Sequence, residues 1–172
     1  NLDTCHVPLI LLTARARVES EMEGIGVGAD DYVAKPFHPD LLRLRVQTLI
    51  ENRQQLIRKY QSADEIIPKD LTRNPLDEAF LQKVIQSIEL NLSNEEFSVE
   101  ELGECVCMSR SNLFRKLKAL TGQTPLEFIY FIRLKHAMQL LLERKYSISE
   151  ITYEVGFKNP SSFSKSFRKQ FG

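Results

Sequence analysis

Two stretches near the end of the chain place cationic and hydroxyl side chains at helical spacing. Ser111, Arg115 and Lys118 share one face of a helix because they recur every three or four residues, and similar residues return 50 positions later. Cationic groups bind phosphate, and Arg or Asn side chains can pair with guanine or adenine edges. The spacing therefore predicts two DNA-binding faces. Their residues are Ser111, Asn112, Arg115, Lys118, Ser161, Ser162, Lys165, Arg168 and Lys169.

The role of each cation within these faces stays open. We expect Arg115 and Lys165 to contact bases, whereas Lys118, Arg168 and Lys169 could equally hold phosphate. The alternative is that both faces are solvated surfaces of a helical bundle. The charge distribution favours binding, because residues 97–172 carry 12 basic and 7 acidic residues although the net charge of the chain is zero.

Residues 98–172 contain the pattern of a helix, a turn and a second helix twice, with Lys158 as one extra residue in the second turn. Each first helix is predicted to start in a capping box, Ser98 with Glu101 and Ser147 with Glu150. The pattern is that of a repeated helix-turn-helix motif. The second helices have Ser109 and Asn159 as predicted caps and Leu113, Leu117, Leu120, Phe163, Phe167 and Phe171 as predicted core residues.

A long helix is predicted between the two motifs, from Thr124 to about Glu143. Thr124, Pro125 and Glu127 form a third capping box with proline at the first helical position. About 20 helical residues span roughly 30 Å, close to the ~34 Å between neighbouring major-groove openings on one face of B-DNA. We therefore interpret this helix as a spacer. Its apolar residues, including Ile129, Ile132, Leu134, Ala137, Leu140 and Leu141, should pack against both motifs.

The composition argues against several kinds of site. Of the 172 residues, 42% are hydrophobic and 27% are charged, as in a globular protein of one or two domains. Cys5, Cys105 and Cys107 form no disulfide or zinc pattern, so we expect buried, reduced thiols. The three histidines have no Cys or Ser partner at catalytic spacing. We predict no catalytic residue, no metal site and no cofactor.

Membrane contact is not expected for this segment. No apolar run approaches the ~18 residues of a membrane helix. We therefore expect a cytoplasmic location, and we leave open that a parent protein is anchored in the inner membrane.

The first 60 residues alternate between strand and helix patterns. Strands are predicted over residues 7–13 and 31–34, a weak helix over residues 18–28, and a long helix over residues 39–60. This alternation is typical of an α/β fold, and everything after Asp77 is predicted to be helical. The expected domains are a partial α/β domain over residues 1–58, a linker over residues 59–76, and a mainly α domain over residues 77–172.

Two stretches resemble the signature of AraC-type (AraC/XylS) transcription regulators, IRLKHAMQLL at 132–141 and ISEITYEVGFKNPSSFSKSFRKQFG at 148–172. The stretch MSRSNLFRKLKALTG at 108–122 is similar to the first recognition helix of that family. The resemblance implies a seven-helix domain with two helix-turn-helix motifs, whose recognition helices enter adjacent major grooves of double-stranded DNA. One departure is that the short segment usual after the final Phe-Gly pair is absent, which would leave the end of the fold frayed.

The front of the chain resembles the C-terminal half of a two-component receiver domain, a flavodoxin-like fold, in VPLILLTAR at 7–15 and GADDYVAKPF at 28–37. The resemblance gives Thr13 and Lys35 the roles of phosphoryl contacts and Tyr32 that of the aromatic switch, and it implies a cis Lys35–Pro36 bond. The alternative is a strand-end hydroxyl and a surface lysine. The phosphoacceptor aspartate belongs to the other half of a receiver, so this chain cannot complete acyl-phosphate chemistry.

The combination indicates a sequence-specific DNA-binding transcription regulator at the output end of a phosphorelay two-component system, within a response regulator or a hybrid sensor. The alternative is a receiver module of a hybrid histidine kinase whose helical tail serves protein–protein contacts. The expected partners are double-stranded DNA, the histidine kinase or phosphodonor domain of the parent protein, and a second copy of the chain. Apolar residues spaced three or four positions apart in the first long helix could form a dimerising coiled-coil seam. They are Leu42, Val46, Leu49, Leu56 and Tyr60. Arg53 interrupts this seam, and packing within the domain explains most of it.

Overall fold

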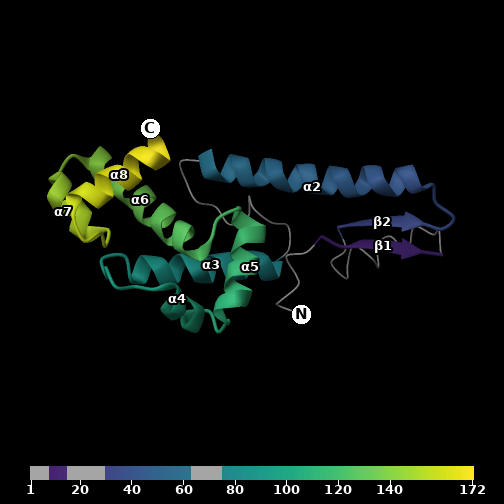
Figure 1. Cartoon of the computed structure of the whole chain (residues 1–172), viewed down its shortest axis with the longest axis horizontal. Helices are drawn as coiled ribbons and strands as arrows, with labels where there is room; N and C mark the ends of the chain where they lie inside the picture. The colour runs from purple at the N-terminus through teal and green to yellow at the C-terminus, as the bar shows by residue number, and fades with distance from the viewer. Residues whose placement is uncertain (1–7, 15–29, 63–74) are drawn as a thin grey trace. The chain divides into compact units, whose positions relative to one another are not determined.

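The computed structural model of the chain describes residues 8–14, 30–62 and 75–172 (Figure 1). The chain divides into two compact units, Asn1–Asp77 and Glu78–Gly172. The helix expected over residues 18–28 lies outside the described residues, and so does most of the expected linker.

The first unit contains two short parallel strands and one long helix. Strand β1 (Ile10–Thr13) pairs with β2 (Asp31–Ala34), with Ile10 opposite Asp31 and Thr13 opposite Ala34. Helix α2 (Pro39–Ser62) runs beside the strands. The predicted bounds of β2 are confirmed, whereas β1 begins at Ile10 rather than at residue 7, and α2 continues to Ser62. The Lys35–Pro36 bond is cis, as expected.

An ion pair fixes α2 to the second strand. Arg45 Nη1 donates to both carboxylate oxygens of Asp31, at 2.7 and 3.0 Å. The hydrogen bond to Asp31 is the main cause that raises the pKa of Arg45. Asp31 is the first residue of β2 and Ala34 is the last, so the ion pair holds α2 at the Asp31 end of the two-stranded sheet.

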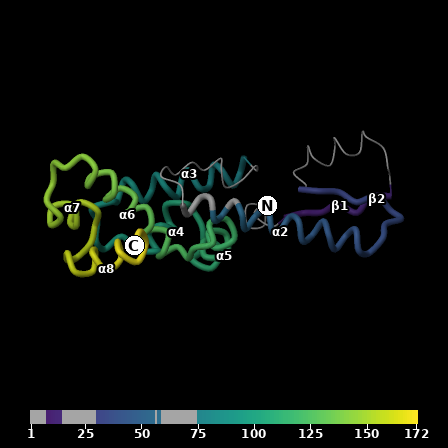
Figure 2. Tube along the Cα trace, turned by 90° about the horizontal axis from the view of Figure 1, so that it is seen from above, coloured from purple at the N-terminus to yellow at the C-terminus, as the bar shows by residue number. Residues whose placement is uncertain are grey.

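The second unit is entirely helical. Its elements are α3 (Pro75–Leu90), α4 (Val99–Cys105), α5 (Arg110–Thr121), α6 (Pro125–Glu143), α7 (Ile148–Glu154) and α8 (Pro160–Phe171). Residues 75–172 thus contain six helices, one fewer than the resemblance implies for this domain, and α2 belongs to the first unit. In both views α4 and α5 lie toward one end of α6, and α7 and α8 lie toward the other (Figures 1 and 2).

The predicted helix starts are confirmed at the level of hydrogen bonds. In each of the three capping boxes, the hydroxyl of the cap accepts from the backbone N–H of the glutamate three residues later, and the glutamate accepts from the backbone N–H of the cap. The three pairs are Ser98–Glu101, Thr124–Glu127 and Ser147–Glu150. Between α5 and α6, Gly122 takes a left-handed conformation with φ of 75°, which lets the chain turn within a few residues.

Helix α6 is the centre of this unit because it packs against α5, α7 and α8. Many of its side chains are buried, as predicted for a helix that contacts both motifs. Its second half joins an apolar cluster with α7 and α8, against which Leu92 from the loop after α3 also packs. The buried members of this cluster are Leu134, Ala137, Ile151, Val155, Phe157 and Phe163.

The expectation of a frayed end is wrong for α8. The helix continues to Phe171, and the backbone N–H of Gly172 donates to the carbonyl of Arg168 at 2.9 Å. Phe171 packs against the apolar cluster of α6 and α7, which holds the last turn in place.

The expectation of buried thiols is wrong for two of the three cysteines. Cys105 and Cys107 are free and exposed, and Cys5 lies outside the described residues. The reason is geometric: Leu102 and Val106, four residues apart, turn toward the core, so Cys105 at the end of α4 points away from it. Cys107 follows the helix in the turn.

Candidate nucleic-acid interface

Helices α5 and α8 hold the predicted DNA-binding residues, and both begin at the predicted caps. The hydroxyl of Ser109 accepts from the backbone N–H of Asn112 at 3.3 Å, and the side chain of Asn159 accepts from that of Ser162 at 2.9 Å. Pro160 follows as the first residue of α8, where its missing N–H costs nothing. These caps fix where each helix starts, and therefore which residues point to the core and which to solvent.

The predicted core-facing residues of both helices are confirmed. Leu113, Leu117 and Leu120 of α5 are completely buried. In α8, Phe163 is buried, while Phe167 and Phe171 are partly buried against the same apolar cluster. The three phenylalanine rings of α8 contact one another in order, with neighbouring centroids 5.6 and 4.8 Å apart. Each helix is thus held along one face, and its opposite face is left toward solvent.

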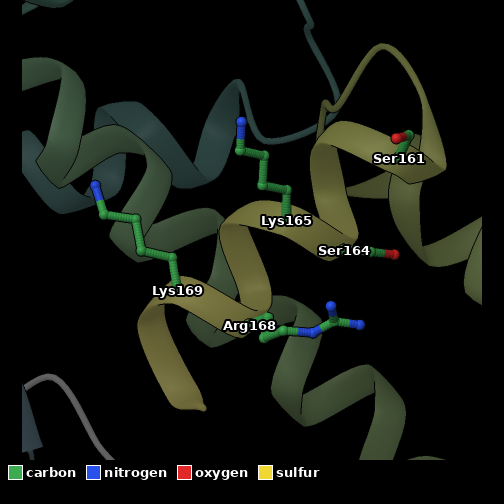
Figure 3. A pocket seen from close by; sticks show the side chains of 5 residues that line it. All are labelled: Ser161, Ser164, Lys165, Arg168 and Lys169. Carbon is green, nitrogen blue, oxygen red and sulfur yellow. The ribbon is translucent and has the colours of Figure 1, made fainter.

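The solvent-facing sides of α5 and α8 hold the nine predicted DNA-binding residues. Of these nine, Asn112 is half-buried and the other eight are exposed. On α8 the cationic residues border one surface pocket, and Figure 3 shows their side chains standing along one helix. Ser164 was not predicted, although it lies on the helix turn between two predicted residues. The lining residues are Ser161, Ser164, Lys165, Arg168 and Lys169.

The exposed face of α5 differs from that of α8. Arg115 donates from Nη2 to the side-chain oxygen of Asn112, and Arg110 Nη1 lies 2.7 Å from Glu100 Oε1 on α4. Phe114 is 45% exposed beside Arg115, although a large aromatic side chain gains most from burial. Sequence reasoning missed both Phe114 and Ser164, which occupy equivalent positions in the two repeats, and their places next to the predicted Arg115 and Lys165 were the available signal.

Glu127 at the start of α6 lies near one cation of α5 and one of α8. Its carboxylate accepts from the backbone N–H of Thr124 at 2.8 Å, and this hydrogen bond is the main cause that lowers the pKa of Glu127. Lys118 of α5 and Lys169 of α8 lower it further. One cation from each of the two helices, Lys118 and Lys169, therefore acts on the carboxylate at the start of α6.

Neither α5 nor α8 contains an acidic residue, whereas α4 and α7 each carry glutamates. The basic C-terminal turns of α5 and α8 also complement the negative ends of the helix dipoles. Positive charge is thus concentrated on the two helices whose exposed faces could meet a phosphate backbone.

Of the three receiver-like residues, Thr13 and Lys35 lie together at one end of the two-stranded layer, whereas Tyr32 lies further back on β2, opposite Leu11. The backbone N–H of Lys35 donates to the carbonyl of Thr13 at 2.7 Å, so these residues are neighbours across the strands. Thr13 and Tyr32 are half-buried, and the Lys35 side chain is exposed. Because the strands are parallel, the hydroxyl-bearing end of β1 and the lysine after β2 meet at the same edge.

Metal-binding and membrane-spanning features are lacking in the described part of the chain. Across residues 8–14, 30–62 and 75–172, no group of three or more His, Cys, Asp or Glu side chains could hold a metal ion. No helix in those ranges combines the length and the apolar character that a membrane crossing requires.

Sequence reasoning also missed Arg133, a cation inside the second unit. Only 3% of it is exposed, and its guanidinium donates to the carbonyls of Gly156 at 2.9 Å and Asn94 at 2.6 Å. Arg133 lies four residues after Ile129 and four before Ala137, at a core-facing spacing, but a charged residue is rarely fully buried, so its burial was not expected. Lys158, noted only as the inserted residue, donates to Glu96 at 2.6 Å.

Known proteins are similar to this chain in whole or in part. A family of helix-turn-helix domains matches residues 102–172. Over 171 residues, 99% of the chain, the sequence is 44% identical to Histidine kinase P4 of Formosa agariphila, of whose length the chain spans 12%.

Two solved structures share the fold of the second unit. The C-terminal domain of AraT, a response regulator from Geobacillus stearothermophilus, is 27% identical, with a TM-score of 0.51 over 59% of this chain and 81% of that one. A transcriptional regulator from Chromobacterium violaceum with an AraC-type DNA-binding domain is 30% identical, with a TM-score of 0.52 over 57% of this chain and 87% of that one. Residues 102–172 therefore form a helix-turn-helix domain of the AraC type, the class of domain that binds DNA.

Proposed function

We propose that this chain is the DNA-reading output end of a two-component phosphorelay, and that α5 and α8 read adjacent major grooves on one face of a duplex. The observation behind the proposal is that α5 and α8 both lack acidic residues, and that each buries an apolar face and exposes a cationic one. Two such faces on one side of a rigid body suit successive grooves, because a major groove returns to the same side of B-DNA after each helical turn.

The length of α6 supports the groove assignment. Its 19 residues extend over roughly 28 Å at about 1.5 Å per residue. Neighbouring major-groove openings on one face of the duplex are about 34 Å apart. Because α5 lies toward one end of α6 and α7 and α8 toward the other, we assign α6 the role of a spacer whose length is close to this repeat.

The cations divide into base readers and phosphate binders. Arg115 and Lys165 occupy equivalent central positions on α5 and α8, and we assign them to base edges. In the free chain Arg115 already donates to Asn112, so on DNA the guanidinium exchanges this acceptor for a guanine edge. Lys118, Arg168 and Lys169 lie nearer the ends of their helices and hold phosphate, with hydroxyl and amide contacts from their exposed neighbours.

The front of the chain would connect this reader to phosphorylation. Thr13 and Lys35 meet at one edge, as a phosphoryl-sensing hydroxyl and lysine require, and Tyr32 lies on the adjoining strand. The similarity to a histidine kinase and to the output domain of a response regulator supports a hybrid sensor or a response regulator as the parent protein. Its histidine kinase or phosphodonor domain would then be the upstream partner, and residues 1–58 would contribute to a homodimer.

Binding to duplex DNA at increasing salt tests the DNA-reading role. A duplex selected from a random library should bind the chain with an affinity that falls linearly with the logarithm of salt, because each neutralised phosphate releases counterions. Replacing Arg168 or Lys169 by Ala should reduce that slope by about one phosphate each. Lys145→Ala is the matched control, because Lys145 is exposed but lies outside both recognition helices. An affinity for DNA that does not change with the salt concentration would instead support the protein–protein alternative.

A further inference from the structure

We infer that Arg133 is the positioning residue that fixes the second helix-turn-helix motif relative to the first, and thereby sets the spacing of the two DNA half-sites. This inference rests on the proposed reading of two adjacent grooves. It starts from an unusual arrangement: a nearly buried guanidinium whose hydrogen bonds run to backbone carbonyls of two segments far apart in the sequence.

The two carbonyls lie in separate segments, one before the first motif and one inside the second. Asn94 lies in the loop that leads into α4 of the first motif, and Gly156 lies in the turn between α7 and α8 of the second. Arg133 itself belongs to α6, so a single side chain joins three segments. Because both acceptors are backbone atoms, the hydrogen bonds fix the path of the chain and not merely a side chain.

The turn between α7 and α8, whose Gly156 carbonyl accepts from Arg133, is packed too closely to hold a side chain at Gly156. Gly156 has φ of 70°, and a Cβ atom there would lie 2.4 Å from the carbonyl oxygen of Leu92 and 2.9 Å from the Arg133 guanidinium carbon. A real side chain cannot occupy that space, so the turn is pressed directly against the loop after α3 and against Arg133. Small rotations of the second motif about α6 would therefore break these contacts.

The charge and surroundings of Arg133 suit a permanent contact. We call its two hydrogen bonds, to Asn94 and Gly156, the Arg133 clamp. Burial lowers the pKa of the Arg133 guanidinium, yet arginine stays charged at any physiological pH. The carbonyl of Gly156 lies just beyond the C-terminal end of α7, where the helix dipole is negative and favours a cation. Breaking the clamp would leave a buried charge without its acceptors, which is far more costly than losing an exposed ion pair.

Two weaker contacts also join the turn between α7 and α8 to α6 and to the loop after α3. The ring of Tyr130 on α6 lies 5.5 Å from that of Phe157. Lys158 donates to Glu96 at 2.6 Å, but both side chains are exposed, so water and salt weaken this pair. Lys158 is the residue inserted in the second repeat, so the first repeat has no residue at the equivalent position. The seam between the motifs is thus specific to the second turn, with Arg133 as its buried member.

Distances between spin labels test the inference without DNA. Labels at Glu104→Cys on α4 and Glu154→Cys on α7, in a chain whose native cysteines are replaced by serine, report the separation of the motifs from exposed positions. We expect a narrow distribution for the chain with native Arg133 and one at least about twofold wider for Arg133→Met, because the clamp no longer selects one arrangement. Lys145→Met is the matched control and should leave the width unchanged. An unchanged width in folded Arg133→Met would overturn the inference.

The same variants on DNA show the consequence for the spacing of half-sites. The probe is a duplex selected from random sequences, with one base pair then inserted between its half-sites. A rigid connection should lose at least about tenfold in affinity on this insertion, whereas Arg133→Met should lose less than about threefold, because a loose connection tolerates the shift. Equal penalties in both proteins would overturn the inference.

A conservative variant of Arg133 allows the test to be completed even if Arg133→Met does not fold. If Arg133→Met does not fold, Arg133→Lys decides, because an ammonium can still donate to one carbonyl at a time. A label distribution wider than that of the unsubstituted chain supports the inference, and an equal width refutes it. If no variant binds DNA, the proposed function fails, while the label distances still decide the role of Arg133.

Discussion

Cys107 and Gly156 lie 49 positions apart and take the same left-handed backbone conformation, with φ of 56° and 70°, at the same step of the two turns. The hydrogen bonds around them match as well: the backbone N–H of Cys107 donates to Glu104 and that of Gly156 to Tyr153, each at 3.0 Å. The repeat seen in the sequence is therefore a repeat of backbone geometry. The two turns differ in their surroundings, because Cys107 faces solvent and Gly156 faces Arg133.

This relationship predicts opposite effects of two substitutions on stability. Cys107→Gly should raise the free energy of unfolding by up to about 1 kcal/mol, because it relieves the cost of a left-handed residue that has a Cβ atom. Gly156→Ala should lower it by more than about 2 kcal/mol, since the new Cβ meets the backbone oxygen of Leu92. Urea denaturation of the three proteins measures both. Equal tolerance of the two changes would show that the turns are not constrained as described.

Substitutions on the exposed faces should separate base readers from phosphate binders. Arg115→Ala and Lys165→Ala should each relax the base preference in one half-site, at a cost of roughly 1 to 3 kcal/mol. Lys118→Ala should weaken binding to all sequences alike, because phosphate contacts carry no sequence information. Competition between the selected duplex and random duplex measures this. If Arg115→Ala lost the same affinity on both duplexes, Arg115 would be a phosphate contact.

The capping box of α6 predicts a pH-dependent contribution to stability. The Thr124 backbone N–H lowers the pKa of Glu127 in the folded chain, so the carboxylate stabilises the fold fully above its unfolded-state pKa and loses this effect as the pH falls through the lowered folded value. Glu127→Gln keeps the hydrogen-bond acceptor but removes the charge. It should be less stable than the unsubstituted chain near neutral pH and equally stable in acid. A difference in the free energy of unfolding that stays constant with pH would contradict this.

The first unit of this chain should associate through its exposed strand edge. Within the described residues β1 pairs only with β2, and Leu9 and Leu12 are 47% and 44% exposed. An unpaired apolar edge favours pairing with another chain. We expect residues 10–13 to acquire strong amide protection only when a second copy associates, while residues 77–172 are protected at any concentration. Hydrogen exchange at several concentrations measures this, and strong protection of residues 10–13 in a dilute monomer would refute it.

The parts of the fold that were predictable from the sequence depend on local chemistry. Capping boxes such as Ser147–Glu150 are read from residue types three positions apart, and the buried face of α5 follows from its leucine spacing. The starts of α5 and α8 could therefore be placed to the residue. The bounds of β1 were less predictable, because a short apolar run does not show where pairing with β2 begins.

The contacts missed by sequence reasoning are those made between distant segments. Nothing near Arg133 in the sequence indicates that its guanidinium meets Asn94 and Gly156, since those carbonyls are brought there by the packing of α6. The burial of the cysteines was misjudged for a related reason: thiols are often buried, but the side of α4 that carries Cys105 faces solvent once the helix has packed.

The central claim is that α5 and α8 read two successive grooves on one face of a duplex, and a half-turn insertion tests it most directly. Affinity is measured for the selected duplex and for the same duplex with about five base pairs inserted between its half-sites, which rotates one half-site to the opposite face. We predict that tight binding is lost and that only the weak, sequence-independent component remains. Affinity that survives the insertion would contradict the claim.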